Sequence, residues 1–432
     1  MTTRVYLVHP VQKARGASDP TDAHDEACSL VRAIDVELVG SVIVPIARAN
    51  PATMIGSGKI IELSAAFTAA EVDVVVVNDD LSPVQQRNLE RAWKLKVLDR
   101  TGLILEIFGE RAQTREGVLQ VDLAHLTYQK SRLVRSWTHL ERQRGGTGSV
   151  GGPGETQIES DRRAIDDKIQ HLKRQLEKVV RTRALHRAAR KKMQEPLVAL
   201  VGYTNAGKST LFNRLTDANV LAEDMLFATL DPTMRQITLP SGRNAIVSDT
   251  VGFISDLPTQ LVASFRATLE EVLEADLIVH VRDIAHPRSH EQNRDVLAVL
   301  SELGVRQQRL EEMIELRNKI DLLDPAEHQA ALTNAARSES VVAGSAVTGE
   351  GIDALLAHIE TRLFPRRIIF TLRLAHSAGK AISWLYGHGE VQGREDGEDG
   401  VDMMVEMTEK EFFQFQKECG AATAEVRATV VA

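Results

Sequence analysis

One octapeptide governs the architecture of this chain: Gly202-Tyr203-Thr204-Asn205-Ala206-Gly207-Lys208-Ser209. It is a complete G-x-x-x-x-G-K-S pattern, directly after the apolar run Leu197–Val201 and directly before a helical pattern over Lys208–Leu215. Backbone N–H groups of such a loop bind phosphate oxygens, the lysine neutralises the β- and γ-phosphates, and the serine hydroxyl is a ligand for Mg²⁺. The pattern predicts a nucleotide-binding P-loop, with Thr210 in its contact set.

Two further motifs identify the base. Asp249-Thr250-Val251-Gly252 follows the strand pattern Ala245–Ser248, so its carboxylate can hold Mg²⁺ through water and its glycine N–H can contact a γ-phosphate. Asn318-Lys319-Ile320-Asp321 ends in a carboxylate that can accept both N1–H and the 2-amino group of guanine, an edge that adenine lacks. Ser345-Ala346-Val347 then offers a backbone amide toward the guanine O6. The order of these motifs after the P-loop predicts GTP rather than ATP.

The segment between the P-loop and Asp249 is expected to respond to the γ-phosphate. Its sequence is Phe227-Ala228-Thr229-Leu230-Asp231-Pro232-Thr233. A threonine in such a switch supplies both a hydroxyl for Mg²⁺ and a backbone N–H. We choose Thr229 over Thr233 for this role, and Ser209 and Thr229 are the expected metal ligands.

One catalytic group of Ras-like GTPases is missing. There a glutamine soon after D-x-x-G orients the attacking water, whereas here Phe253 follows Gly252. We therefore expect slow intrinsic hydrolysis, with Lys208, Thr229, Gly252 and Asn205 as the catalytic set. Asn205 occupies the position where an asparagine holds a monovalent cation in potassium-activated relatives, so K⁺ stimulation is a hypothesis.

Around the P-loop, residues 195–365 alternate strand and helix patterns, which predicts a doubly wound, mostly parallel sheet. Residues 1–125 predict a smaller α/β domain, and residues 366–432 a small α+β domain with an acidic turn at Gly393–Gly400. The 432 residues are too many for one hydrophobic core. Gly56-Ser57-Gly58-Lys59 is interpreted as a plain turn, with a second nucleotide site as the alternative.

Residues 126–194 are expected to form a helical hairpin. A helical pattern over Val118–Leu140 leads to the glycine-rich segment 144–155, and a second helix extends to about Met193. Its apolar seam is spaced like a coiled coil: Ile165, Ile169, Leu172, Leu176 and Val179.

Charge is concentrated in this hairpin. The chain has a net charge of −8, yet residues 130–192 hold 17 Lys or Arg and 7 Asp or Glu. Such a surface can bind phosphates without sequence specificity; the alternative is a solvated helix face. The 13 of these basic residues that we assign to the surface are Arg132, Arg135, Arg142, Arg144, Lys173, Arg174, Lys178, Arg181, Arg183, Arg187, Arg190, Lys191 and Lys192. Gly145–Gly154 is the candidate tip for entering an RNA cavity, unless it is only a linker.

The cellular setting follows from composition. Cys28 and Cys419 are far apart in the sequence, which argues against a disulfide framework or a zinc site. No run of about 18 uncharged apolar residues suggests a membrane span. We expect a cytoplasmic monomer without stable membrane insertion, although peripheral association with a membrane stays open.

At this point the chain resembles the HflX family of translational GTPases over nearly its whole length. The resemblance rests on the P-loop, Phe227–Asp231, Asp249–Phe253 and Asn318–Asp321, and on two segments outside the GTPase domain, Asn50–Lys59 and Gly152–Gln157. It implies an N-terminal α/β domain with a helical hairpin, a central GTPase domain and a small C-terminal domain. It also implies binding to the large ribosomal subunit and its rRNA, and splitting or rescue of stalled ribosomes.

The sequence departs from the family pattern where an apolar strand is expected before Asn318, because Glu315 and Arg317 lie there, and where Arg282 precedes Asp283. Our interpretation is a Mg²⁺-dependent enzyme that hydrolyses GTP to GDP and phosphate. Alternatives are a P-loop kinase or ATPase, a ribosome-assembly GTPase, and a nucleotide-switched RNA-binding protein with little turnover.

Overall fold

The computed structural model divides the chain into two compact units, Met1–Leu355 and Leu356–Ala432. The described residues are 2–12, 20–143, 153–193, 195–216, 227, 233–254, 271–365, 367–397, 400–419 and 423–430, with backbone only for 134–143, 153–158, 183–193 and 423–430.

A four-stranded parallel sheet opens the first unit, with strand order β2-β1-β3-β4. The strands are β1 (Thr3–Gln12), β2 (Val36–Ile46), β3 (Val74–Val77) and β4 (Lys96–Asp99). Runs of valine suit strands covered on both faces. The helices between them are α1 (Pro20–Arg32), α2 (Ser57–Ala69), α3 (Pro83–Trp93) and α4 (Arg100–Arg111). The capping box of Ser82 and Gln85 starts α3, with Pro83 as its first residue.

The interpretation of Gly56–Lys59 as a plain turn was wrong. Gly56 is the N-cap of α2, and the other three residues form the first turn of that helix. Lys59 Nζ donates to Glu62 Oε1 at 2.6 Å, an i,i+3 pair on the helix surface. The glycines therefore start a helix here.

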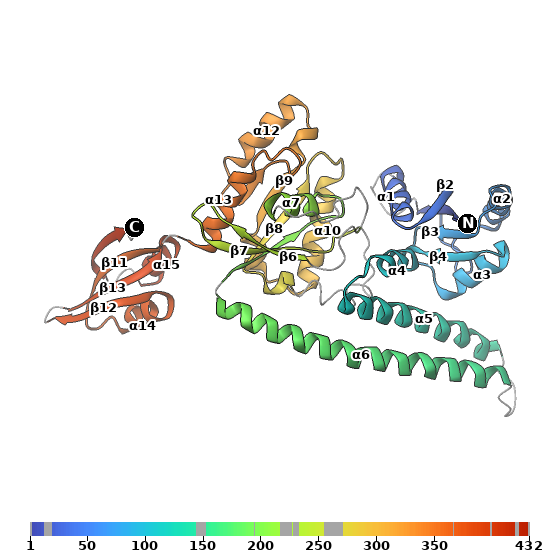
Figure 1. Cartoon of the computed structure of the whole chain (residues 1–432), viewed down its shortest axis with the longest axis horizontal. Coiled ribbons are helices and arrows are strands. Elements are labelled where there is room, and N and C mark those ends of the chain that lie inside the picture. The colour runs from blue at the N-terminus through green and yellow to red at the C-terminus, as the bar shows by residue number, and fades with distance from the viewer. Residues whose placement is uncertain are drawn as a thin grey trace. The chain divides into compact units, whose positions relative to one another are not determined.

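The two long helices of the hairpin are α5 (Arg115–Gln143) and α6 (Pro153–Met193). They run side by side (Figure 1), with an ion pair between Lys130 and Asp166 and with Ile169 of the predicted seam 7% exposed. The predicted insertion tip at Gly145–Gly154 lies mostly outside the described residues.

Arg132 does not belong to the phosphate-binding surface to which the sequence assigned it. Its guanidinium, 16% exposed, pairs with the fully buried carboxylate of Asp99 and lies 4.3 Å from the ring centre of Tyr128. Asp99 also accepts hydrogen bonds from Tyr128 Oη at 2.6 Å and from Gly102 N at 2.8 Å, the latter as the N-cap of α4. Arg132 therefore anchors α5 to the N-terminal sheet.

Replacing Arg132 with alanine is expected to destabilise the protein by about 3 kcal/mol, because it leaves the buried Asp99 carboxylate without its cationic partner. Urea unfolding measures this change. Arg174→Ala on the exposed face of α6 is the matched control and should change the unfolding free energy by less than about 0.5 kcal/mol. Equal effects of the two substitutions would contradict the anchoring role.

A second, six-stranded sheet of the first unit has the order β10-β9-β8-β5-β7-β6. Its strands are β5 (Leu197–Val201), β6 (Thr233–Thr238), β7 (Asn244–Asp249), β8 (Leu277–Asp283), β9 (Ile314–Asn318) and β10 (Val341–Ala343). All neighbours pair in parallel except β6 with β7, which confirms the predicted mostly parallel sheet. Thr233, the second switch threonine considered, starts the antiparallel strand β6.

The helices of this region are α7 (Lys208–Thr216), α10 (Ser289–Glu302), α11 (Gln307–Glu311), the short 3₁₀ helix η1 (Ile320–Leu322), α12 (Pro325–Ala335) and α13 (Ile352–Leu363). Figure 1 labels α7, α10, α12 and α13.

The charged residues that depart from the family pattern fit inside strands because they pair. Arg282 on β8 is 8% exposed and donates to Glu315 Oε1 on the adjacent strand β9 at 3.0 Å. The nearby Arg282 and Arg317 guanidinium groups hold the pKa of Glu315 below its usual range, against the effect of burial. Arg282 also donates to Ser289 Oγ at 2.9 Å. The charged residues that depart from the family pattern therefore compensate one another's charge inside the sheet.

The second unit contains a four-stranded antiparallel sheet, β12-β13-β11-β14. Its elements are β11 (Arg367–Leu374), α14 (Gly379–His388), β12 (Glu390–Gly397), β13 (Gly400–Thr408), α15 (Glu409–Cys419) and β14 (Thr423–Val430). The acidic turn expected at Gly393–Gly400 was largely wrong, since residues up to Gly397 continue β12, and α14 was not predicted. Trp384 and Phe415 from the two helices join the core against strand residues such as Phe370.

Candidate functional site

The predicted phosphate loop joins β5 to α7, and glycines in it and beside it allow close packing. Gly207 has φ +95°, and a Cβ there would lie 2.3 Å from Asn318 Nδ2. A Cβ on Gly252 would lie 2.8 Å from Thr204 Cγ2 and 3.0 Å from Lys208 Nζ. Three motifs that are distant in the sequence thus meet at the carboxyl edge of one sheet.

Lys208 is deeply buried, at 6% exposure, and its Nζ donates to the Tyr203 carbonyl at 2.9 Å. Burial lowers the pKa of Lys208 to about 8, although the Asp249 charge acts in the opposite direction. An ammonium held this way is poised for an anion, because a phosphate would replace the lost hydration.

Next to Lys208 lies an oxygen pair suited to a hard cation. Ser209 Oγ donates to Asp249 Oδ2 at 2.7 Å, and Asp249 is fully buried at the end of β7. A serine hydroxyl and a carboxylate match the oxygen ligands that Mg²⁺ prefers. The residues present therefore fit the predicted metal. In the described ranges, no group of three or more His, Cys, Asp and Glu residues is arranged to hold a metal ion.

The segment after Asp249 is hydrogen-bonded to β5 and to the phosphate loop. Thr250 Oγ1 donates to the Leu200 carbonyl at 2.6 Å, Thr204 N donates to the Phe253 carbonyl at 2.6 Å, and Phe253 N donates to the Gly202 carbonyl at 3.1 Å. Val251 and Phe253 are buried, and Phe253 is 2% exposed. Phe253 offers no polar atom beyond its backbone, so it cannot orient a water molecule through its side chain.

On the opposite side of the phosphate loop, Asn318 connects the two loops expected to hold a base. Asn318 is 1% exposed, with Nδ2 donating to the Ala206 carbonyl at 2.7 Å and Oδ1 accepting from Ala346 N at 2.9 Å. Lys319 has φ +66° and pairs with Asp283 at 2.8 Å. Asp321 is exposed on η1, where a ligand can reach its carboxylate.

The remaining base-side residues support this arrangement. Ile320 is fully buried beneath η1, and its N–H donates to the Gly344 carbonyl at 3.4 Å. Ser345 is also fully buried, whereas Val347 is 66% exposed. The two predicted base loops are thus rigidly supported, with Asp321 and Val347 at the surface.

The remaining predicted site residues belong to the switch segment 227–231, to the phosphate loop and to α7. Ala228, Thr229, Leu230 and Asp231 are outside the described residues. Phe227 is 2% exposed, and its ring packs edge-on against Phe108 of α4, with 4.7 Å between ring centres. Asn205 is exposed with φ +59°, and Thr210 is partly buried on α7.

Two contacts at this site were not anticipated from the sequence. Tyr203 Oη donates to Glu26 Oε2 of α1 at 2.8 Å, and Glu26 Oε1 accepts from Arg100 at 2.7 Å. On α7, Arg214 Nε donates to the Ala346 carbonyl at 2.6 Å. Glu26 and Arg214 belong to no spacing motif, so the sequence carried no signal for their roles.

Comparisons with known proteins match this chain over most of its length. Family models match at residues 21–109 ("GTP-binding GTPase N-terminal"), 111–190 ("GTP-binding GTPase Middle Region"), 197–319 ("50S ribosome-binding GTPase") and 330–428 ("HflX C-terminal domain"). GTPase HflX of Magnetococcus marinus is 48% identical over 403 residues, covering 93% of this chain and 92% of that protein. The chain belongs to the HflX family of GTPases. It is accordingly a GTP hydrolase.

Another relative agrees with the HflX assignment. GTPase HflX of Escherichia coli is 43% identical over 380 residues, covering 88% of each chain. Among solved structures, a GTP-binding protein from Sulfolobus solfataricus in complex with GDP aligns with 22% identity and a TM-score of 0.45, covering 84% of this chain and 99% of that one. In the described part of the chain, no helix is both long and apolar enough to cross a bilayer.

For this HflX chain, GDP binding is expected to weaken above pH 8. With the pKa of Lys208 at about 8 in the nucleotide-free protein, Lys208 loses its proton above that pH, whereas bound phosphates favour the charged form. Binding at pH 9 should therefore take up close to one proton, and affinity should fall by up to about tenfold per pH unit. Calorimetry in buffers of different ionisation enthalpy measures the uptake. Equal affinities at pH 7.5 and 9 would contradict it.

Proposed function

We propose that the residues at this site hold GTP in the following way. Lys208, Ser209, Thr229 and Asp249 surround the phosphates, and the Gly252 N–H contacts the γ-phosphate. Asn318 and Asp321 lie on the guanine, with the Ser345–Val347 backbone toward its O6. The observation that carries this assignment is that Asn318 bonds both the phosphate loop and the Ser345–Val347 loop, so the phosphate and base motifs form one site.

Hydrolysis proceeds by direct attack of water on the γ-phosphorus. The new bond joins the water oxygen to phosphorus, and the bond from phosphorus to the β–γ bridging oxygen breaks, which leaves GDP and phosphate. Lys208 stabilises the charge that develops on these oxygens. When bound at Ser209 and Thr229, Mg²⁺ neutralises phosphate charge. Since the Phe253 side chain cannot orient the water, backbone groups, another residue or a partner must do so, and intrinsic turnover is slow.

Asn205 supports a further proposal, that K⁺ stimulates hydrolysis. Its left-handed backbone and exposed side chain leave the amide oxygen accessible next to the phosphate loop. GTP turnover measured in equal concentrations of K⁺ and Na⁺ tests this idea. A higher rate in K⁺ that Asn205→Ala abolishes supports the proposal, and equal rates in the two salts would remove it.

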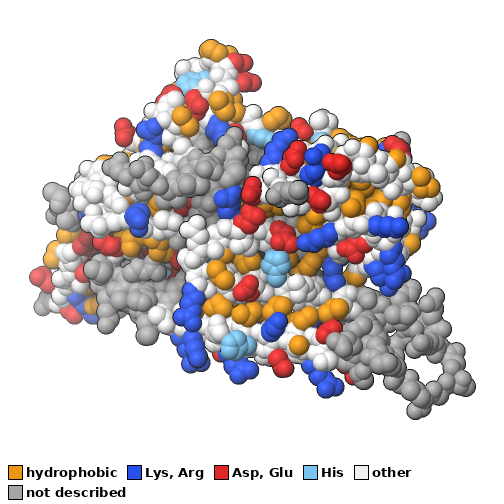
Figure 2. All heavy atoms as spheres, turned by 45° about the vertical axis from the view of Figure 1, so that its right-hand side comes forward, with side chains coloured by type: hydrophobic (Ala, Val, Ile, Leu, Met, Phe, Trp, Pro, Cys, Tyr) orange, Lys and Arg blue, Asp and Glu red, His pale blue; other side chains and the backbone are white. Residues whose placement is uncertain are grey.

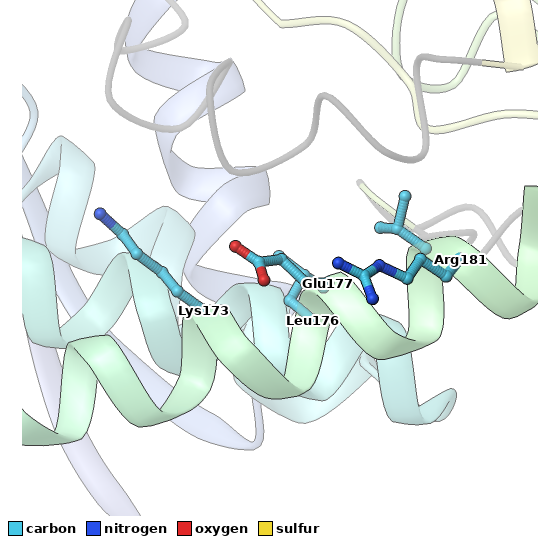
Figure 3. Close-up of a pocket in the computed structure, with 5 residues that line it drawn as sticks. Lys173, Leu176, Glu177 and Arg181 are labelled. Carbon is cyan, nitrogen blue, oxygen red and sulfur yellow. The ribbon is translucent and has the colours of Figure 1, made fainter.

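We propose that the α5–α6 hairpin binds the large ribosomal subunit through rRNA phosphates, and that GTP-controlled docking in the cytoplasm splits or rescues stalled ribosomes. Lys173, Arg174, Lys178 and Arg181 are exposed on α6. Figure 2 shows Lys and Arg side chains along its lower edge, where α6 lies, and Figure 3 shows Lys173 and Arg181 at a pocket that also includes Leu176 and Glu177. The description "50S ribosome-binding GTPase" of the matched central family supports the same partner.

Sedimentation with ribosomal particles tests this partner. We expect co-migration with large subunits in a non-hydrolysable GTP analogue and release in GDP. Arg174→Glu with Arg181→Glu should weaken binding more than tenfold at 0.1 M salt and lower its salt dependence. Lys94→Glu with Lys380→Glu, the same change of net charge at exposed sites elsewhere, should not.

The outcomes separate the alternative functions. Absence of nucleotide-dependent co-migration would remove the ribosomal assignment and leave the GTPase assignment intact. Preference for immature particles would indicate ribosome assembly, and conversion of stalled ribosomes to free subunits would indicate splitting. Affinity changes without GTP turnover would indicate a regulatory RNA-binding protein.

A further inference from the structure

The loop after β10 lacks support from regular secondary structure. Residues Gly344–Gly351 leave the sheet and return into α13, with Gly349 and Gly351 at φ +92° and +76°. Within the loop, Ser345 N donates to the Glu350 carbonyl and Gly349 N donates to the Ser345 carbonyl, both at 2.9 Å. These bonds close the base of the loop but do not involve the Ala346 and Val347 carbonyls.

Those two carbonyls are held by an arginine from another element. Arg214, on the last turns of α7, donates from Nε to the Ala346 carbonyl at 2.6 Å and from a terminal guanidinium nitrogen to the Val347 carbonyl. A Cβ on Gly349 would lie 2.8 Å from the other terminal nitrogen, so the guanidinium fills the space beside this glycine. Charged donors to backbone carbonyls are stronger than neutral ones, and the planar fork fixes two peptides together.

The hydrogen bond from Arg214 to the Ala346 carbonyl determines the orientation of the peptide group between residues 346 and 347. In a trans peptide the N–H points away from the carbonyl of the same unit. With the Ala346 carbonyl directed at Arg214, the Val347 N–H is directed to the opposite side of the loop. Ala346 N already donates to Asn318 Oδ1 at 2.9 Å, whereas Val347 N donates to no group in the described part of the chain. Val347 N–H is therefore the donor available to a ligand.

We propose that Arg214 is a positioning residue for guanine recognition: it orients the Val347 N–H toward the keto oxygen at C6 of the base. This inference rests on the proposed placement of guanine between Asp321 and the Ser345–Val347 loop. It differs from a contact with phosphate, because Arg214 acts on the base loop from the far end of the helix that starts at Lys208. The helix that begins at the phosphates thus also sets the geometry of base recognition.

The test compares GDP with the 2-aminopurine riboside diphosphate, which keeps the 2-amino group but lacks the C6 oxygen and the N1 proton. For Arg214→Ala, the affinity for GDP should fall about tenfold, the loss of one hydrogen bond. Affinity for the 2-aminopurine nucleotide should change less than twofold. Arg214→Lys, which can reach one carbonyl, should restore part of the discrimination. Arg337→Ala, an exposed arginine near the end of α12, is the control and should behave as wild type.

Two results would overturn the proposal: unchanged GDP affinity in Arg214→Ala, or equal losses for both nucleotides. Thermal unfolding without nucleotide shows whether Arg214→Ala has a folding defect. If it has one, the test uses Arg214→Lys instead, and compares its ratio of GDP affinity to 2-aminopurine nucleotide affinity with that of wild type. Wild-type protein that binds ADP as tightly as GDP would instead defeat the proposed guanine site itself, so the two failures are distinguishable.

Discussion

Replacing Asp321 with asparagine is expected to change the base preference from guanine to xanthine. The Asp321 carboxylate is exposed on η1 and offers only acceptors, which match the N1–H and 2-amino donors of guanine. An asparagine amide places a donor against those donors, whereas xanthine carries an acceptor at C2. GDP affinity should fall on the order of 10²-fold, and xanthosine diphosphate should bind more tightly than GDP.

Competition with a fluorescent guanine nucleotide measures this change, with GDP, XDP and ADP as competitors. Asp324→Asn is a matched control, because it removes one negative charge three residues later. Asp324 caps α12 through bonds to Ala326 N and Glu327 N, and asparagine is also a good N-cap. The control should keep the wild-type preference. If Asp321→Asn leaves selectivity unaltered, or if ADP binds wild-type protein as tightly as GDP, the base assignment is wrong.

Replacing Lys208 with methionine is expected to abolish GTP turnover without destabilising the nucleotide-free fold. The substitution removes the ammonium that stabilises phosphate charge, so the hydrolysis rate should fall at least about 10³-fold. The free energy of unfolding, in contrast, should stay the same or rise. Lowering the pKa of a lysine from 10.5 to about 8 reflects a penalty of about 3 kcal/mol for holding the charge in the folded protein at neutral pH. Methionine keeps the apolar stem and avoids that penalty.

Urea unfolding and single-turnover hydrolysis together test this pair of effects. We expect an unfolding free energy for Lys208→Met equal to or up to about 3 kcal/mol above wild type at pH 7. Ser209→Ala serves as a comparison, since it removes the proposed Mg²⁺ ligand and leaves the buried lysine. A methionine variant that is both inactive and strongly destabilised would show that Lys208 supports the fold rather than the substrate.

Local signals predicted the strand and the helix on either side of the Gly202–Ser209 loop, because these elements depend on neighbours along the chain. The phosphate loop needs a strand, glycines and a helix start in immediate succession, and all three were visible around Gly202–Ser209. The hydrogen bonds of Asn318 to Ala206 and Ala346 then joined motifs that the sequence could only place in order. Strands that contain charged residues were harder to predict. The charges of Arg282 and Glu315 are tolerated inside a sheet because the two residues are neighbours on adjacent strands.

Spacing and residue type alone established that this chain carries a phosphate loop, a guanine motif and a basic helical hairpin, since these depend on neighbours along the chain. Tertiary packing decided which arginines serve which purpose. Arg132 faces the buried carboxylate of Asp99 instead of solvent, and Arg214 reaches the carbonyls of a loop 132 residues away. The reason is physical: a buried charged side chain needs a partner that compensates the cost of burial, and the fold determines which residue lies close enough to be that partner.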